Sequence, residues 1–341
     1  MHVMTLKGKS NHYNVKFLKG YGHFISVKNS KIILKDCHDP FSESEKEEWF
    51  VKNMPYEKII LSGKGYVSTE ALSILSQNNR NVILLDNKGN PVTFCNGMMN
   101  SLTATKYRIA QYDTFRDEKR RQYLEKQLIS AKKESQLKLL KTIGSSVENL
   151  PDKEHLASKI YFSEFSKFIP EKYGFTSRNQ SFIRNSKNDA TDVINALLNY
   201  GYSVLAGEIS KFVCGFGLDP YFGFMHRTHS GFQPLVYDLI EPFRWLVDYT
   251  VFQIAIHKDS RYRIKLKEFA HTREGNVVLE YDLLKRFLEM LERNFQKERK
   301  FEFRPGKKTE DHLKTVKEIT IIKLIIQNLI GFCLGKNVLP I

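Results

Sequence analysis

The chain has 341 residues, 41% of them hydrophobic, which allows two ordinary domains with a substantial core and argues against wholesale disorder. Its 53 lysine and arginine residues outnumber its 38 aspartate and glutamate residues, and the net charge of +15 indicates a polyanionic or acidic partner. Four cysteines lie far apart with no C-x-x-C pair, which argues against a disulfide scaffold or a zinc ribbon and favours a reduced, cytoplasmic chain.

Neither end of the sequence predicts a membrane segment. The N-terminal residues lack the apolar core of a signal peptide. The most apolar C-terminal run, residues 319–334, is interrupted by Lys323, Gln327 and Asn328, so it is too short and too polar to span a bilayer. We therefore expect a soluble intracellular protein with no membrane partner.

Residues 1–95 have the pattern of a small β-rich domain. Short alternating apolar and polar runs fill 12–35, and Gly20, Gly22 and the Asn-Ser pair at 29–30 separate them as in hairpins. The elements expected after these are strand 58–61, a short capped helix at 68–75, strand 82–86, a turn at 87–90 and a strand at about 91–95.

The pattern becomes helical after a short linker at 96–101. Residues 103–141 contain neither proline nor glycine, and their apolar residues recur at helical spacing. Further helical patterns occur at about 153–168, 189–210, 234–257, 280–300 and 311–335. We expect an α+β protein in which the β-rich domain 1–95 precedes a larger, nearly all-α domain, 102–341.

Two carboxylates lie in an unusually apolar helical pattern. Asp238 and Glu241 are three residues apart and so share one helix face, where both can reach a single ion. Pro242 follows and should loosen the helix there, because it cannot donate a hydrogen bond to the carbonyl of Asp238. A divalent cation would neutralise the two acids, with His226 on the preceding turn as a plausible further ligand. Ion pairs with Arg244 or a lysine are the alternative.

His226 also forms an H-x-x-H spacing with His229. A zinc site is conceivable, but there is no H-E-x-x-H sequence and the neighbouring glycines and phenylalanines indicate a turn rather than a helix. A buried or capping histidine is the usual outcome of such a spacing.

Other catalytic motifs are missing from the sequence. There is no G-x-G-x-x-G, no G-x-x-x-x-G-K-[ST] and no G-x-S-x-G, so nucleotide hydrolysis and serine catalysis are poorly supported. The sequence G-K-G at 63–65 indicates only a turn. A helix should begin after Pro151 with Asp152 as its N-cap, and Glu154 would then lie in the first turn, where acids interact favourably with the helix dipole.

Several runs, taken together, resemble the CRISPR-associated endonuclease/integrase family, that of the first CRISPR-associated protein, which acquires spacers. The central runs are GLDP at 217–220, GFMH at 223–226 and LVYDLIEPFR at 235–244. Similar runs are EHLASKIYF at 154–162, DVINALLNYGY at 192–202, GYVSTEAL at 65–72 and VILLD at 82–86. The resemblance covers nearly the whole chain.

The resemblance implies a β domain that serves in dimerisation and an α-helical domain that carries a metal site. By motif, the metal ligands would be Glu154, His226 and Glu241, with Asp238 close by in the catalytic site. Relatives often have Asp where this chain has Glu241, which is one methylene longer and keeps the charge. Two carboxylates and an imidazole suit Mn²⁺ and tolerate Mg²⁺.

The resemblance also implies the activity and the partners. A 3′-hydroxyl of a short double-stranded protospacer would attack a phosphodiester of a CRISPR repeat, and water in its place would give endonuclease cleavage; both serve adaptive antiviral defence. The protein would act as a homodimer, with pairs of dimers bridged by a dimer of a small second CRISPR-associated protein. The basic residues expected to hold DNA phosphates are Lys106, Arg108, Arg116, Lys119, Arg120, Arg121, Lys132, Lys133, Arg244, Arg261, Arg263, Lys265 and Lys267.

Three alternatives stay open. A casposase, which is a transposon-borne relative, would run the same chemistry on the ends of its own element; casposases often carry an added DNA-binding module, for which little room is expected after residue 335. A non-catalytic architectural DNA-binding protein would pair the two acids with arginines. A metal-dependent hydrolase of small phosphoesters would not need the basic helices.

Overall fold

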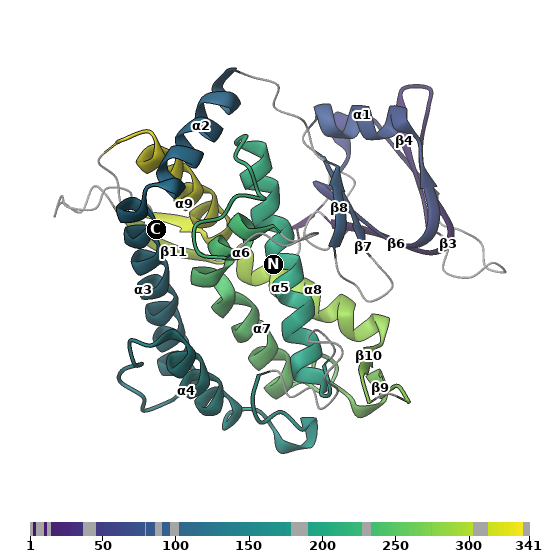
Figure 1. Cartoon of the computed structure of the whole chain (residues 1–341). Helices are drawn as coiled ribbons and strands as arrows, with labels where there is room; N and C mark the ends of the chain where they lie inside the picture. Colours follow the sequence, from purple (N-terminus) through teal and green to yellow (C-terminus); the bar gives the residue numbers. More distant parts are fainter. Residues whose placement is uncertain are drawn as a thin grey trace. The chain divides into compact units, whose positions relative to one another are not determined.

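The structure is a computed structural model of the whole chain. It describes residues 3–4, 10–11, 15–36, 46–78, 80–85, 91–95, 102–178, 190–226, 233–273, 275–302 and 313–336. The chain divides into two compact units, one formed by residues 1–105 with 210–218 and the other by residues 106–209 with 219–341 (Figure 1). The expected linker at 96–101 and His229 lie outside the described residues.

The N-terminal unit is built on a six-stranded sheet in the order β5-β4-β3-β6-β7-β8. Its strands are β3 (Val15–Lys28), β4 (Lys31–Lys35), β5 (Lys46–Trp49), β6 (Lys58–Val67), β7 (Asn81–Leu85) and β8 (Pro91–Cys95). The pairs β3–β6 and β6–β7 are parallel, and the other neighbours are antiparallel. The short strands β1 (Val3–Met4) and β2 (Ser10–Asn11) pair separately.

Helix α1 (Thr69–Gln77) connects β6 to β7 and packs on the sheet (Figure 1). Ser68 caps it as expected, because its side chain accepts a hydrogen bond from the backbone N–H of Ala71. Ala71 and Leu75 are fully buried in the same core as Leu18 and Ile25 of β3. A 3-10 turn, η1 (Val51–Asn53), follows β5.

The glycines of this sheet mark a close approach of two strands rather than turns. Asn29 and Ser30 do form the expected hairpin turn, with φ of 52° and 59°. The G-K-G sequence at 63–65, however, lies inside β6, so the predicted turn there is wrong. A Cβ on Gly63 would lie 2.4 Å from the carbonyl oxygen of Gly20 on β3, which explains why neither strand carries a side chain at that crossing.

The chain from residue 102 onward is mostly helical, and together with the N-terminal sheet this confirms the α+β class. Its helices are α2 (Leu102–Arg116), α3 (Glu118–Ile143), α4 (Glu154–Ser166), α5 (Val193–Gly215), α6 (Pro234–Ile240), α7 (Arg244–Ile256), α8 (Tyr281–Phe295) and α9 (Glu318–Cys333). Short 3-10 turns are η2 (Glu171–Tyr173), η3 (Glu241–Phe243) and η4 (Leu266–Glu268). Helices α5, α7 and α8 pack tightly at Gly201, where a Cβ would lie 2.4 Å from Val247 Cγ1 and 2.8 Å from Phe287 Cζ.

Helical boundaries differ from the predicted ones in three places. The stretch 103–141 is divided at Asp117, whose carboxylate accepts a hydrogen bond from the backbone N–H of Arg120 (2.8 Å) and caps α3. Asp152 is not an N-cap, because Lys153 holds that position and the Asp152 side chain is exposed and paired with Lys133. Residues expected to be helix ends instead form a hairpin of β11 (Glu298–Glu302) and β12 (Leu313–Lys317).

The β11 sequence alternates exposed and half-buried side chains, which suits a strand better than a helix. A second hairpin joins β9 (Phe269–His271) and β10 (Val277–Leu279). Among the described residues, no helix combines the length and apolarity that a membrane crossing requires.

Candidate active site

The segment that carries the two acids is a helix interrupted at Pro242. Helix α6 ends at Ile240, residues Glu241–Phe243 form the 3-10 turn η3, and α7 begins at Arg244. The predicted loosening of the helix at Pro242 is thereby confirmed. Leu235, Val236, Leu239 and Ile240 are at most 1% exposed, so the apolar residues fix this segment in the core and leave the acids no direct access to bulk water.

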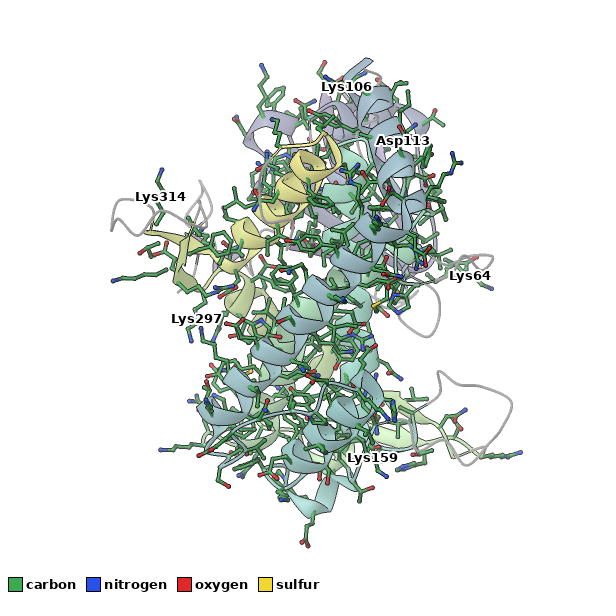
Figure 2. The ribbon with its side chains drawn as sticks, turned by 60° about the vertical axis from the view of Figure 1, so that its left-hand side comes forward. Lys64, Lys106, Asp113, Lys159, Lys297 and Lys314 are labelled. Atoms are coloured by element: carbon green, nitrogen blue, oxygen red, sulfur yellow. The ribbon has the colours of Figure 1, made fainter. Side chains whose placement is uncertain are left out.

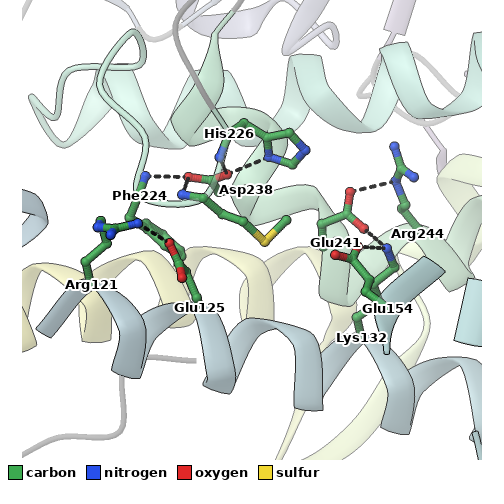
Figure 3. A network of polar contacts seen from close by, with 10 residues as sticks. Arg121, Glu125, Lys132, Glu154, Phe224, His226, Asp238, Glu241 and Arg244 are labelled. Carbon is green, nitrogen blue, oxygen red and sulfur yellow. Dashed lines mark hydrogen bonds and ion pairs between the residues drawn. The ribbon is translucent and has the colours of Figure 1, made fainter. Parts of the chain in front are cut away.

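Glu154 of α4 and Glu241 of η3 meet at one cation, the ammonium of Lys132 on α3 (Figure 3). Lys132 Nζ lies 2.8 Å from Glu154 Oε1 and 2.7 Å from Glu241 Oε2. The Lys132 side chain is 7% exposed and contacts the two carboxylates, so its binding to DNA stays a prediction. Sequence spacing could not bring these residues together, because the contacts join three separate elements.

Arg244 completes the charges around Glu241. Its Nε lies 3.4 Å from Glu241 Oε1, and its guanidinium stacks 4.5 Å from the ring centroid of Tyr202. Glu241 therefore pairs with two cations, through Oε2 with the Lys132 ammonium and through Oε1 with the Arg244 guanidinium. The ion-pair alternative is therefore what the structure shows for Glu241.

Asp238 contacts a different set of groups from Glu241. Its Oδ2 accepts hydrogen bonds from the backbone N–H of Phe224 (2.7 Å) and Met225 (3.1 Å). Its Oδ1 accepts one from the backbone N–H of His226 (2.9 Å) and lies 2.6 Å from the Nδ1 of that ring. Gly223 is required beside it, because a Cβ there would lie 2.7 Å from Asp238 Oδ2.

The imidazole of His226 is thus held through Nδ1 by a fully buried carboxylate (Figure 3). The hydrogen bond with Asp238 raises the pKa of His226 above its ordinary value, although partial burial opposes the shift. The charge of Glu241 also raises this pKa, so the ring lies within electrostatic reach of Glu241.

The two neighbouring cations determine the charge of Glu241. Burial by itself would raise the pKa of Glu241, but Arg244 and Lys132 outweigh it and hold that pKa below its ordinary value. Glu241 is therefore an ionised carboxylate in a buried position.

A buried glutamine on α2 fixes the start of the turn that leads to His226. Gln111, which is fully buried, donates from Nε2 to the carbonyl oxygens of Asp219 (2.9 Å) and Phe222 (2.8 Å). Its Oε1 accepts the backbone N–H of Asp219 (2.9 Å), and the Tyr112 hydroxyl donates to the Asp219 carboxylate (2.8 Å). A lone glutamine in a helical pattern gives no sequence signal of this role.

A further buried carboxylate, Asp248 of α7, holds in place the tyrosine ring on which Arg244 stacks. Asp248 accepts hydrogen bonds from the hydroxyls of Tyr161 (2.7 Å) and Tyr202 (2.5 Å). Tyr202 in turn provides the ring on which Arg244 stacks, and Arg178 lies over the same ring at 5.3 Å. An acid in the apolar pattern of α7 is the sequence feature that indicates such a buried polar contact.

Some of the predicted DNA-binding cations have exposed side chains, and others are paired with carboxylates. Those with exposed side chains on α2 and the start of α3 are Lys106, Arg108, Arg116 and Lys119. Figure 2 shows Lys106 and Asp113 along α2. Arg121 pairs with Glu125, Lys133 with Asp152 and Arg261 with Asp259, at 2.6, 2.7 and 2.6 Å.

Arg120 has a structural contact instead, since it donates to the carbonyl oxygen of Phe332 (2.7 Å) at the end of α9. Arg263 is half-buried, and Lys265 lies 3.8 Å from Glu268. Lys267 is exposed.

A divalent cation fits the carboxylate pair. Glu154 and Glu241 already converge on one cationic atom, the Lys132 ammonium, and Glu241 is buried with its pKa held below the ordinary value. Within the part of the chain that the structure describes, no three His, Cys, Asp or Glu side chains form a group close enough to hold a metal ion. The imidazole of His226 thus lies near the pair but outside it.

Comparison with known proteins identifies the family. The sequence model of "CRISPR associated protein Cas1" matches residues 17–150 and 142–293. The CRISPR-associated endonuclease Cas1 1 of Archaeoglobus fulgidus is 31% identical over 278 residues, which cover 70% of this chain and 77% of the relative. The CRISPR-associated endonuclease Cas1 2 of Saccharolobus solfataricus is 30% identical over 257 residues, covering 72% and 76%.

Solved structures agree with the sequence comparison. A casposase bound to its integration product superposes with a TM-score of 0.80 at 25% identity, over 94% of this chain and 91% of that one. A CAS1 protein from Thermotoga maritima has the same fold, with a TM-score of 0.72 at 17% identity over 95% and 98% of the two chains. The chain therefore belongs to the family of the CRISPR-associated protein Cas1.

Proposed function

We propose that this protein is a metal-dependent DNA endonuclease and integrase that inserts short DNA duplexes into a CRISPR repeat in the cytoplasm. The observation that carries the proposal is the convergence of Glu154 and Glu241 on one cationic position beside an oriented imidazole. Membership of the Cas1 family, whose relatives above are named endonucleases, supports the reaction class.

Glu154, Glu241 and His226 would hold a Mn²⁺ or Mg²⁺ ion. Such an ion, when bound, neutralises the attacked phosphate and stabilises negative charge on the attacking or leaving oxygen. The carboxylate of Asp238 would accept a hydrogen bond from Nδ1–H of His226, which leaves Nε2 with a free lone pair as the metal-binding atom. Asp238 thus acts as a positioning residue rather than as a ligand.

The reaction needs no protein nucleophile. The oxygen of a DNA 3′-hydroxyl bonds to the phosphorus of a repeat phosphodiester as the bond from phosphorus to the repeat's own 3′-oxygen breaks. The released oxygen takes up a proton, so one diester is exchanged for another. When water attacks instead, the product is a cleaved strand. The chain's residues would hold the ion and keep the attacked phosphate beside it.

The proposed partners are double-stranded DNA and other protein subunits. The exposed cations of α2 and α3 suit the DNA backbone, and the casposase neighbour is described as bound to its integration product. A Cas6-RT-Cas1–Cas2 complex contains a chain of this fold, with a TM-score of 0.65 at 18% identity. By analogy we propose a homodimer, pairs of which are bridged by a dimer of a Cas2-type protein.

The direct test is Glu241→Ala in a joining assay with a 3′-hydroxyl duplex, a supercoiled plasmid and Mn²⁺. We expect duplex binding close to that of the wild type and loss of both joining and cleavage. Glu125→Ala, which removes a glutamate paired with Arg121 on the surface of α3, is the matched control and should retain joining. Full joining by Glu241→Ala would remove Glu241 from the mechanism, and joining in chelator would remove the metal.

The casposase similarity favours a second candidate, in which the same chemistry acts on the ends of a mobile element. Sequencing the joined products separates the two. A Cas1 integrase should insert duplexes of arbitrary sequence at a repeat, whereas a casposase should require the terminal sequence of its element and accept targets without a repeat.

A further inference from the structure

We propose that Lys132 is a built-in counter-ion, which holds the place of the divalent cation in the metal-free protein and has to leave before that cation binds. The inference rests on the proposed function, because it assigns the carboxylates of Glu154 and Glu241 to a metal ion. It adds that the affinity for the ion is set by competition inside the protein.

The geometry of the ammonium is that of a bound cation. Lys132 Nζ lies within 2.8 Å of one oxygen from each carboxylate, so it links α4 to η3, which are distant in sequence (Figure 3). A divalent ion would use these same oxygens. Two cations on the same oxygens repel each other, most strongly at the buried Glu241 carboxylate, so the ammonium and the metal ion cannot share the position.

The placement of Lys132 on α3 shows that it belongs to the interior. The buried residues of α3 are Leu124, Leu128, Lys132, Gln136, Leu139 and Leu140. A fully buried lysine is rare unless it is paired, and here each of its partners is a carboxylate proposed to bind metal. Lys133, the next residue, lies on the outer side and pairs with the exposed Asp152.

The two cations beside Glu241 differ in how easily they can move. Arg244 stacks on Tyr202, and the Tyr202 hydroxyl is fixed by the buried Asp248, so its guanidinium is held in place. Lys132 is a compact charge on a flexible four-carbon stem, and its ammonium contacts the two carboxylates. Lys132 is therefore the cation that exchanges, while Arg244 keeps Glu241 ionised before and after the exchange.

The first test uses the wild-type protein, so it does not depend on a variant that folds. An amine-reactive reagent is applied with and without saturating Mn²⁺, and the modified lysines are mapped by mass spectrometry. We expect Lys132 to be modified several-fold faster when Mn²⁺ is bound, while Lys133 changes by less than about twofold and serves as the internal reference. An unchanged or slower modification of Lys132 at saturating Mn²⁺ overturns the inference.

The second test measures Mn²⁺ affinity by the electron paramagnetic resonance of the free ion. Removing the competing charge in Lys132→Met should tighten binding about tenfold or more, whereas Lys132→Arg should bind as weakly as the wild type or more weakly. Lys133→Met is the matched control and should leave the affinity unchanged.

The outcomes separate this inference from the proposed function. Wild-type protein that binds Mn²⁺, together with a folded Lys132→Met that binds it no more tightly, overturns the counter-ion role and leaves the metal site intact. Failure of both proteins to bind Mn²⁺ at any concentration overturns the metal site itself, and the counter-ion role with it.

Discussion

Asp238 and Glu241 lie three residues apart on one buried segment, yet their surroundings are opposite in kind. Asp238 is fully buried and accepts three backbone N–H groups of the turn 224–226 in addition to the His226 ring. Glu241 is 4% exposed and is surrounded by the side-chain cations Lys132 and Arg244. The first carboxylate is tied to the main chain, and the second is balanced by charges that can be replaced.

The difference indicates which of the two carboxylates is suited to bind a metal ion. Backbone donors cannot leave without unfolding the turn, so Asp238 shapes the site and orients His226. A side-chain ammonium can move away, which is why we propose that Glu241 exchanges Lys132 for a divalent cation. Proximity in sequence was therefore misleading, and the source of the donors decides the role.

The largest expected effect on stability belongs to Asp238→Ala. It leaves three backbone N–H groups without their acceptor, and an unsatisfied buried donor costs about 1–3 kcal/mol. Since such costs are not additive, we expect the free energy of unfolding to fall by about 3 kcal/mol or more in urea denaturation. Asp238→Asn, which keeps one acceptor oxygen, should lose less. A loss below about 1 kcal/mol for Asp238→Ala would show that the turn does not depend on this carboxylate.

Glu241→Gln should be destabilised less, by about 1–2 kcal/mol without metal, because Lys132 retains Glu154 and Arg244 retains the Tyr202 ring. Its main defect should be in metal-linked stability. The wild type should gain about 2.7 kcal/mol at a Mn²⁺ concentration 100 times the Kd, and the variant almost nothing. Equal stabilisation of both proteins by Mn²⁺ would contradict the division between the two acids.

The His226–Asp238 contact predicts a pH dependence of stability in the metal-free protein. The folded-state pKa of His226 is raised, chiefly by the hydrogen bond with Asp238, so the folded protein binds the proton more tightly than the unfolded chain. The contribution is complete below the unfolded pKa of about 6.5 and is lost as pH rises through the higher folded value.

The measurement is the difference in unfolding free energy between the wild type and His226→Ala in chelator, at about pH 5.5 and about pH 8.5. We expect the difference to be larger at the lower pH. A difference that grows with pH would mean that the imidazole, not the imidazolium, is the form that Asp238 stabilises.

The smallest expected effect comes from Asp117, which resembles Asp238 in accepting a backbone N–H, but accepts only that of Arg120. Asp117→Ala should lower the free energy of unfolding by about 1 kcal/mol, the usual value of an N-cap. Asp113→Ala, at an exposed position inside α2, is the control and should change it by less than about 0.5 kcal/mol. An equal effect of the two substitutions would show that the cap does not stabilise the start of α3.

The sequence could predict features that depend on neighbouring residues. The Ser68 cap, the hairpin turn at Asn29 and Ser30 and the loosened helix at Pro242 are local, and the structure confirms each of them. The division at Asp117 is local too, but the apolar spacing continues through Asp117, so the pattern predicts one uninterrupted helix there.

What could not be predicted depends on contacts between distant residues. Lys132 and Glu241 are far apart in sequence, and a lysine in a helical pattern ordinarily indicates a solvated surface. The same holds for Gln111, which contacts Asp219 and Phe222 across more than a hundred residues. Gly63 and Gly65 predict a turn when only their sequence neighbours are considered, because those neighbours do not show that another strand passes beside them. The local pattern suggests Glu241 and His226 as metal ligands, whereas Glu154 is proposed only because of the resemblance to the family.

Anomalous diffraction from crystals of the protein soaked in Mn²⁺ tests most directly whether Glu154, His226 and Glu241 surround one divalent cation. We predict a single strong manganese peak bonded to an oxygen of each glutamate and to Nε2 of His226, with the Lys132 ammonium moved away. A manganese peak elsewhere, or none at saturating Mn²⁺ with Lys132 still between the two glutamates, would contradict the account.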